Sequence, residues 1–146
     1  MGRENQWIST IQGLIESCRA GQEGYRRAAE HVAGRHLRDF LTEQSERRGQ
    51  FVSELKRPFD LIGPALLPSG PPGPGAWTLP EDKLRNGDES ILGTLEAADE
   101  ALRKQYRRAL EGDLPPAVAE TVRHQLVSFR EADDLLNLLH ERRKAA

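Results

Sequence analysis

The sequence lacks several features on which assignments of class and function often rest. Aromatic residues make up only 5% of its 146 residues, so a core must be built mainly from Leu, Ile, Val and Ala, which suits helices better than a β-sandwich. No apolar run reaches the roughly 18 residues that a membrane-spanning helix needs, and the N-terminal MGRENQW lacks the apolar part of a secretory signal. We therefore expect a single cytoplasmic domain over residues 1–146, with no membrane partner.

Disulfides and a strong net charge are also missing. Cys18 is the only cysteine, which excludes an internal disulfide and agrees with a reducing compartment. The net charge is −2, from 21 basic and 23 acidic residues, and this balance argues against nucleic acid as a partner. The sequence contains no phosphate-binding glycine loop, no Ser-His-Asp set and no Cys-x-x-Cys pair. We expect no cofactor, and the sequence favours a protein that is not an enzyme.

The histidines do not stand where a di-metal helical bundle needs them. Such bundles take two ligands from a Glu-x-x-His motif on each of two helices. No Glu-x-x-His motif occurs here, because the positions three residues before the histidines are Ala28, Ala33, Thr121 and Asn137. We therefore expect the four histidines, His31, His36, His124 and His140, to be solvated surface residues.

What the sequence does contain is helical periodicity. In the predicted helix at 5–32, residues recur at steps of four and three along one stripe, namely Trp7, Ile11, Leu14, Cys18, Gly21, Tyr25, Ala28 and Val32. Glycine costs about 1 kcal/mol relative to Ala inside a helix, so a glycine on the stripe indicates a close approach by another element. We expect close packing at Gly21 and a surface position for Gly24.

Three more helices are predicted, at 35–56, 89–111 and 115–144. Between the second and third lies a segment at 58–87 that holds seven of the nine prolines, so no long helix crosses it. We interpret it as a crossover anchored by Leu66, Leu67, Trp77 and Leu79; a disordered proline-rich tether is the alternative. Two tight turns and one long Pro/Gly-rich crossover between the second and third helices predict an all-α, up-down-down-up four-helix bundle with ferritin-like connectivity.

Polar residues interrupt the apolar stripes at one height of the predicted bundle. They are Gln22, Gln44, Arg48, Asp99, Gln125 and Asp133. A buried charge is tolerated when it is paired, so we expect Arg48 to pair with Asp99 or Asp133. Two acids beside an arginine are a poor site for divalent ions, and Asp99 and Asp133 would be the metal ligands if there are any. We interpret this layer as one that fixes helix register, with Gly21, Tyr25, Trp77 and Tyr106 as packing or pocket candidates.

Several short runs together resemble a known family. They are 14–18, 21–30, 48–51 with 54–55, 75–77, 86–88 with 91–92, and Tyr106 with 109–110 and 113–116. In order and spacing they resemble the bacterial PA2169-family four-helix-bundle proteins, a ferritin-like domain of unknown function (DUF2383 type). The resemblance implies a ferritin-like bundle without an assigned enzymatic activity. Relatives often carry acids or a histidine on the inner faces, where this chain has Gln22, Asp99 and Asp133.

Three functions remain open on these grounds. The first is a non-catalytic helical bundle that acts through structure or association, with itself or with a protein partner. The second is a carboxylate-type protein that binds iron or another divalent metal, or resembles an oxidase, with a reduced ligand set. The third is a bundle with an apolar ligand pocket near Gly21, covered by Trp77.

Overall fold

The protein is all-α in the computed structural model, which describes residues 6–67 and 77–145. Four long helices dominate it: α1 (Gln6–His31), α2 (Arg35–Lys56), α5 (Asp88–Glu111) and α6 (Pro116–Ala145). Each lies within about one residue of its predicted bounds, which is the usual uncertainty of a helix end. The predicted starting residue of the first helix, Asn5, lies outside the described residues.

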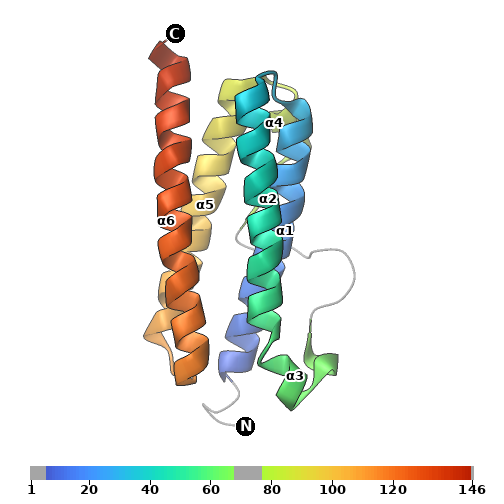
Figure 1. Cartoon of the computed structure of the whole chain (residues 1–146), viewed down its shortest axis with the longest axis vertical. Helices are drawn as coiled ribbons and strands as arrows, with labels where there is room; N and C mark the ends of the chain where they lie inside the picture. The colour runs from blue at the N-terminus through green and yellow to red at the C-terminus, as the bar shows by residue number, and fades with distance from the viewer. Residues whose placement is uncertain (1–5, 68–76, 146) are drawn as a thin grey trace.

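The long helices pack in two pairs, α1 with α2 and α5 with α6 (Figure 1). The turn between α1 and α2 spans residues 32–34, too short for anything but an antiparallel hairpin. A similarly short link, residues 112–115, joins α5 to α6. Among the described residues, no helix is both long and apolar enough to cross a membrane.

The described parts of the connection between α2 and α5, residues 57–67 and 77–87, contain three short elements. α3 (Phe59–Ile62) and the 3₁₀ helix η2 (Pro64–Leu66) follow α2 at one end of the bundle, and α4 (Glu81–Leu84) precedes α5 at the other (Figure 1). Trp77 and Leu79 are buried and anchor this connection to the helices. Leu66 is exposed, so the prediction that it is an anchor is wrong. The glycine- and proline-rich run at 68–76 lies outside the described residues.

The core is mainly aliphatic, with a few aromatic contacts at defined heights. Trp7 packs against Phe59 near one end, with ring centroids 6.1 Å apart. Phe129 makes edge-to-face contacts with Phe51 and Tyr106 in the middle of the bundle, at 5.0 and 4.9 Å. Such contacts add about 0.5–1.5 kcal/mol beyond area burial. They hold α2, α5 and α6 together at the height where buried polar side chains gather.

Candidate functional site

Asp99 on α5 is the centre of the buried polar residues. Its Oδ1 accepts hydrogen bonds from Arg48 Nη2 of α2, at 2.9 Å, and from Trp77 Nε1, at 2.6 Å. Its Oδ2 accepts the hydroxyl hydrogen of Tyr25 on α1. Burial by itself raises the pKa of Asp99, but the charge of Arg48 and the donated hydrogen bonds hold that pKa below its usual value. We call Tyr25, Arg48, Trp77 and Asp99 the Asp99 network.

Arg48 is almost completely buried and keeps its charge. Its guanidinium lies between the rings of Tyr25 and Phe129, 4.8 and 4.6 Å from their centroids. Burial opposes the charged form, and the carboxylate of Asp99 more than compensates, so the pKa of Arg48 is raised. The cation is thus balanced by one carboxylate and two aromatic faces, from α1, α5 and α6.

Two glycines on α1 make room for this network. A Cβ atom at Gly21 would lie 2.8 Å from Arg48 Nη1, and one at Gly24 would lie 2.1 Å from Cζ3 of Trp77. The structure therefore shows close packing at Gly21, as predicted. Gly24 is buried beneath the Trp77 indole, so the surface position predicted for it is wrong. Glycines three residues apart share a helix face, and here they form the flat surface on which Trp77 lies.

Replacing Gly24 by Ala is expected to destabilise the protein by about 1–3 kcal/mol, because the new methyl group overlaps the indole and forces Trp77 out. The loss should exceed the roughly 1 kcal/mol that Ala gains over Gly in helix propensity. Urea unfolding of Gly24→Ala measures the loss of stability, and tryptophan emission measures the displacement of Trp77. Both are recorded in a Trp7→Phe background, which leaves Trp77 as the only tryptophan.

Gly93→Ala is the matched control for this variant. A Cβ there meets His140 Cε1 at 3.6 Å, an ordinary contact, so helix propensity should dominate and the protein should gain up to about 1 kcal/mol. Equal stabilisation by both alanines, with unchanged Trp77 emission, would show that the indole does not lie on Gly24.

A second set of hydrogen bonds lies around Tyr106 on α5. The Tyr106 hydroxyl donates to Gln125 Oε1 of α6, at 2.7 Å, and lies 3.1 Å from the sulfur of Cys18. Gln125 Nε2 in turn donates to Glu54 Oε1, at 2.9 Å, and to a backbone carbonyl of α2. Burial raises the pKa of the Cys18 thiol to about 11, which disfavours the thiolate and a role as nucleophile. We call Cys18, Glu54, Tyr106 and Gln125 the Tyr106 network; it links all four long helices.

Asp133 on α6 lies beside Asp99 and behaves differently. Burial, the negative charge of Asp99 and a hydrogen bond to Asp99 raise the pKa of Asp133 to about 8. Among the described residues, neither Asp133 oxygen accepts a hydrogen bond, although Oδ2 lies 3.1 Å from Arg103 Nη1. The charge of Arg103 opposes this rise in pKa without cancelling it, so the protonated form of Asp133 is favoured near neutral pH.

The structure brings most of the predicted polar residues together. Arg48, Asp99, Gln125 and Asp133 are buried in the middle of the bundle, and Gln44 is buried on α2 one turn before Arg48. Tyr25, Trp77 and Tyr106, predicted as packing or pocket residues, are hydrogen-bond donors to this layer.

Gln22 is the exception to the predicted layer, because its side chain is exposed. The residue lies over Gly49 of α2, where a Cβ would come within 2.7 Å of Gln22 Nε2. Gln22 follows Gly21 by one residue, which turns its side chain about 100° away from the stripe that faces the core. The prediction that Gln22 joins the buried layer is therefore wrong.

His140 also departs from expectation. Its side chain is buried on α6, its Nδ1 pairs with Glu96 of α5, and its Nε2 lies 4.0 Å from Glu89. The expectation of a solvated surface residue is wrong for His140, whereas the other three histidines are exposed. A signal was present in the sequence, since His140 continues the buried stripe of α6 one turn beyond Leu136.

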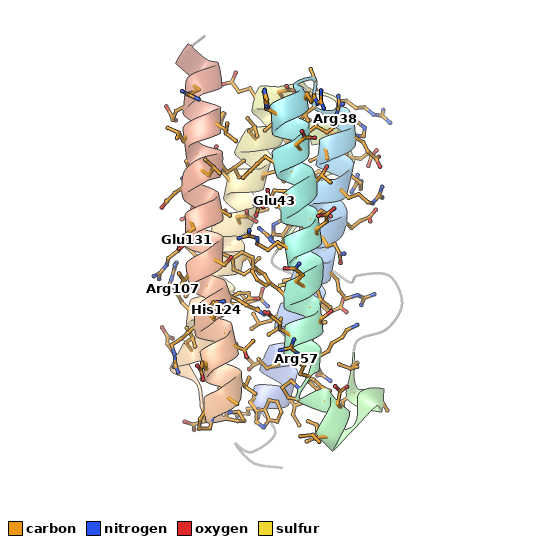
Figure 2. All side chains as sticks on the ribbon, in the orientation of Figure 1. Arg38, Glu43, Arg57, Arg107, His124 and Glu131 are labelled. Atoms are coloured by element: carbon orange, nitrogen blue, oxygen red, sulfur yellow. The ribbon has the colours of Figure 1, made fainter. Side chains whose placement is uncertain are left out.

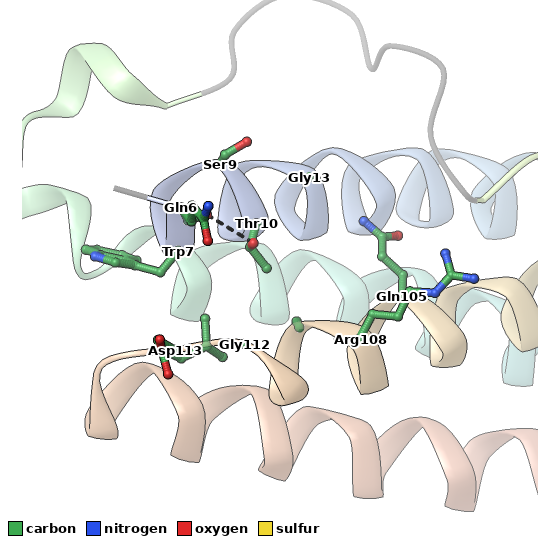
Figure 3. Close-up of a pocket in the computed structure, with 11 residues that line it drawn as sticks. Gln6, Trp7, Ser9, Thr10, Gly13, Gln105, Arg108, Gly112 and Asp113 are labelled. Carbon is green, nitrogen blue, oxygen red and sulfur yellow. Dashed lines mark hydrogen bonds between the residues drawn. The ribbon is translucent and has the colours of Figure 1, made fainter. Parts of the chain in front are cut away.

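A separate groove of about 300 Å³ lies between the start of α1 and the end of α5 (Figure 3). Gln105 and Arg108 of α5 lie on one side of it, and Thr10 of α1 lies on the other. The Thr10 hydroxyl donates to the Gln6 carbonyl, and Gln105 Oε1 accepts from Ser17, so these groups satisfy one another locally. The groove contains none of the Asp99 network.

The chemistry of the polar layer follows from its hydrogen bonds. Both oxygens of Asp99 already accept from protein donors, so a metal ion would have to displace Arg48, Trp77 or Tyr25. In the parts of the chain that the structure describes, no group of three or more His, Cys, Asp or Glu residues is placed to hold a metal ion. The arrangement ties the four helices and the connection before α5 into one register.

Comparison with known proteins adds one finding to this geometry. No curated protein matches the chain. The matched family is described as a domain of unknown function (DUF2383), and its match covers α1, α2 and the start of α3. These elements carry Gly21, Tyr25 and Arg48. The resemblance inferred from the sequence is thus confirmed for this part of the chain: residues 6–60 match the family model of the domain of unknown function DUF2383.

Proposed function

We propose that this protein is a non-catalytic helical bundle that acts by association, with a second copy of itself or with a protein partner, in the cytoplasm. The observation that carries the proposal is the saturation of Asp99 by Arg48, Trp77 and Tyr25. The Asp99 network, the most polar part of the interior, therefore serves to hold the helices together. The buried thiol of Cys18, which has no disulfide partner, fits a reducing compartment.

The fold that we propose is the ferritin-like, up-down-down-up bundle. Its support is the pairing of α1 with α2 and of α5 with α6, together with the position of α3 and α4 at opposite ends of the bundle (Figure 1). A connection that starts at one end and finishes at the other makes α2 and α5 run in the same direction, which is the one-crossover pattern of ferritin-like proteins.

The second candidate is a metal-binding protein with a reduced carboxylate set. One observation favours it: Asp99 and Asp133 lie together at mid-height, and the Asp133 oxygens accept no hydrogen bond from the described residues. Against it stand the raised pKa of Asp133, because a divalent ion must compete with a proton for that carboxyl group near neutral pH, and the nearby charge of Arg48. We place iron or another divalent ion second for these reasons.

Two measurements separate these candidates. We expect protein purified from iron-supplemented cells to carry less than about one tenth of an equivalent of metal by elemental analysis, with Asp99→Asn as the matched control. A stoichiometric metal content that Asp99→Asn removes would overturn the first proposal. Affinity capture after mild crosslinking in cells should recover the second copy or a defined partner. A metal-free protein that stays monomeric and captures nothing would also overturn it.

A further inference from the structure

An apolar surface lies at the end of the bundle formed by α3 and η2. Leu61 is 92% exposed, Ile62 is 47% exposed and Leu66 is 40% exposed. We call these three residues the Leu61 cap. A single exposed leucine needs no explanation, but three together in six residues, two of them on a four-residue helix, form a patch that water solvates poorly.

Beside the Leu61 cap lies a groove that is also apolar. It has a volume of about 460 Å³ and runs between the end of α2 and the start of α6. Its apolar lining consists of Trp7, Pro58, Leu61, Ile62, Pro115, Ala117 and Val118. Leu61 thus belongs both to the wall of the groove and to the most protruding part of the cap. A surface that carries a protruding leucine next to an apolar groove has the shape needed to fit a copy of itself.

Charges of both signs surround this groove. Glu54 of α2 and Arg57, the residue that follows α2, line it, and Glu120, Arg123 and His124 line the adjoining groove from α6. Arg57 and His124 are labelled near this end of the two helices in Figure 2. A two-fold axis through such a surface can set the acids of one copy against the bases of the other. A membrane surface or a strongly charged partner would instead favour one sign of charge.

We propose that the Leu61 cap and its groove form a two-fold interface in which Leu61 of each copy enters the groove of the other. The proposal rests on the proposed function and names the surface and the partner through which association takes place. Each contact hides a leucine that water otherwise surrounds, together with the groove wall around Trp7 and Pro115. Because the contact is made twice, the removal of one side chain per copy acts twice on the dimer.

Sedimentation equilibrium on the full chain, over about 1–100 µM, tests the interface with Leu61→Asp and its control Leu138→Asp. Leu138 is 56% exposed on the outer face of α6, far from α3 along the chain, and it lines no part of the groove. We expect a dimer for the wild type and for Leu138→Asp. Leu61→Asp should dissociate at least about 100-fold more readily, because two carboxylates enter apolar grooves. Circular dichroism checks that each variant is folded. Leu61→Ser, which adds no charge, should weaken the dimer less than Leu61→Asp does.

The outcomes distinguish the interface from the proposed function. A wild-type dimer that Leu138→Asp breaks and Leu61→Asp leaves intact would overturn the interface and keep association as the function. A wild type that stays monomeric at 100 µM would overturn the interface as well, and the proposed function would then rest on capture of a different partner. Loss of the dimer in Leu61→Asp alone, with both variants folded, would establish the surface.

Discussion

Replacing Arg48 by Met is expected to lower the free energy of unfolding by about 3–5 kcal/mol, the largest effect that we anticipate for a single polar residue. Methionine keeps the length of the side chain between the Tyr25 and Phe129 rings but removes the cation. Asp99 is then left in the interior with only the neutral donors Trp77 and Tyr25, and it must either bear an unpaired charge or take up a proton, both at a cost in stability. Urea unfolding at pH 7 measures the loss.

Two further variants test this explanation. Arg26→Met removes an exposed arginine that pairs with Glu23 and Glu30, and it should change stability by less than about 1 kcal/mol. Combining Arg48→Met with Asp99→Asn removes both buried charges, so the double variant should be more stable than Arg48→Met alone. If Arg48→Met is as mild as Arg26→Met, or if Asp99→Asn makes it worse, the Asp99 network does not depend on charge balance.

Replacing Asp133 by Asn is expected to abolish a fall in stability that the wild type shows as the pH rises from about 4 to about 8. The native state holds the Asp133 proton up to about pH 8, whereas an unfolded Asp releases it near pH 4. Between these values the native state binds more protons, so stability decreases with pH, by at most about 1.4 kcal/mol per pH unit from this group. Above the native pKa the contribution no longer changes.

The sign of this effect separates Asp133 from Asp99. The pKa of Asp99 is lowered, so the stability that Asp99 contributes is present above about pH 4 and is lost as the pH falls through its native pKa. The window between pH 4 and pH 8 therefore reports on Asp133. Asparagine has nearly the shape of the protonated acid and cannot ionise, so the variant keeps the neutral form at every pH.

Urea unfolding of the wild type and Asp133→Asn at pH 5, 6, 7 and 8 measures this dependence. The two proteins should converge toward low pH, and the variant should be more stable by at least about 1 kcal/mol at pH 8. Asp134→Asn, at the neighbouring exposed position, should follow the wild-type curve. A difference between wild type and Asp133→Asn that stays constant from pH 5 to pH 8 would show that Asp133 is ionised throughout.

Helix bounds and the height of the polar residues could be predicted because both depend on local periodicity. The steps of four and three around Leu14 and Tyr25, and the polar interruptions at Arg48 and Asp99, are visible along single helices. Burial of Arg48 and its pairing with one of the two acids follow from the cost of an isolated buried charge. The same local pattern does not predict whether the protein associates or binds a metal ion.

Which side chain reaches which partner could not be predicted, because it depends on how each helix is rotated against its neighbours. Asp99 and Asp133 were equal candidates to pair with Arg48. In the structure Arg48 pairs with Asp99, whose Oδ1 also accepts a hydrogen bond from Trp77 of the connection. Gln22 was misplaced for the same reason, since one residue decides whether it faces the core or Gly49. Gly24 was misread because its partner, Trp77, lies 53 positions away in the sequence.

The anchoring of Trp77 also has a consequence for the length of the connection between α2 and α5. The indole fixes one point of that connection, and Leu79 and Leu84 fix the part that follows, so residues 77–87 have a set length. An insertion or a deletion between Trp77 and the start of α5 is therefore opposed, because it would draw a buried anchor out of the core.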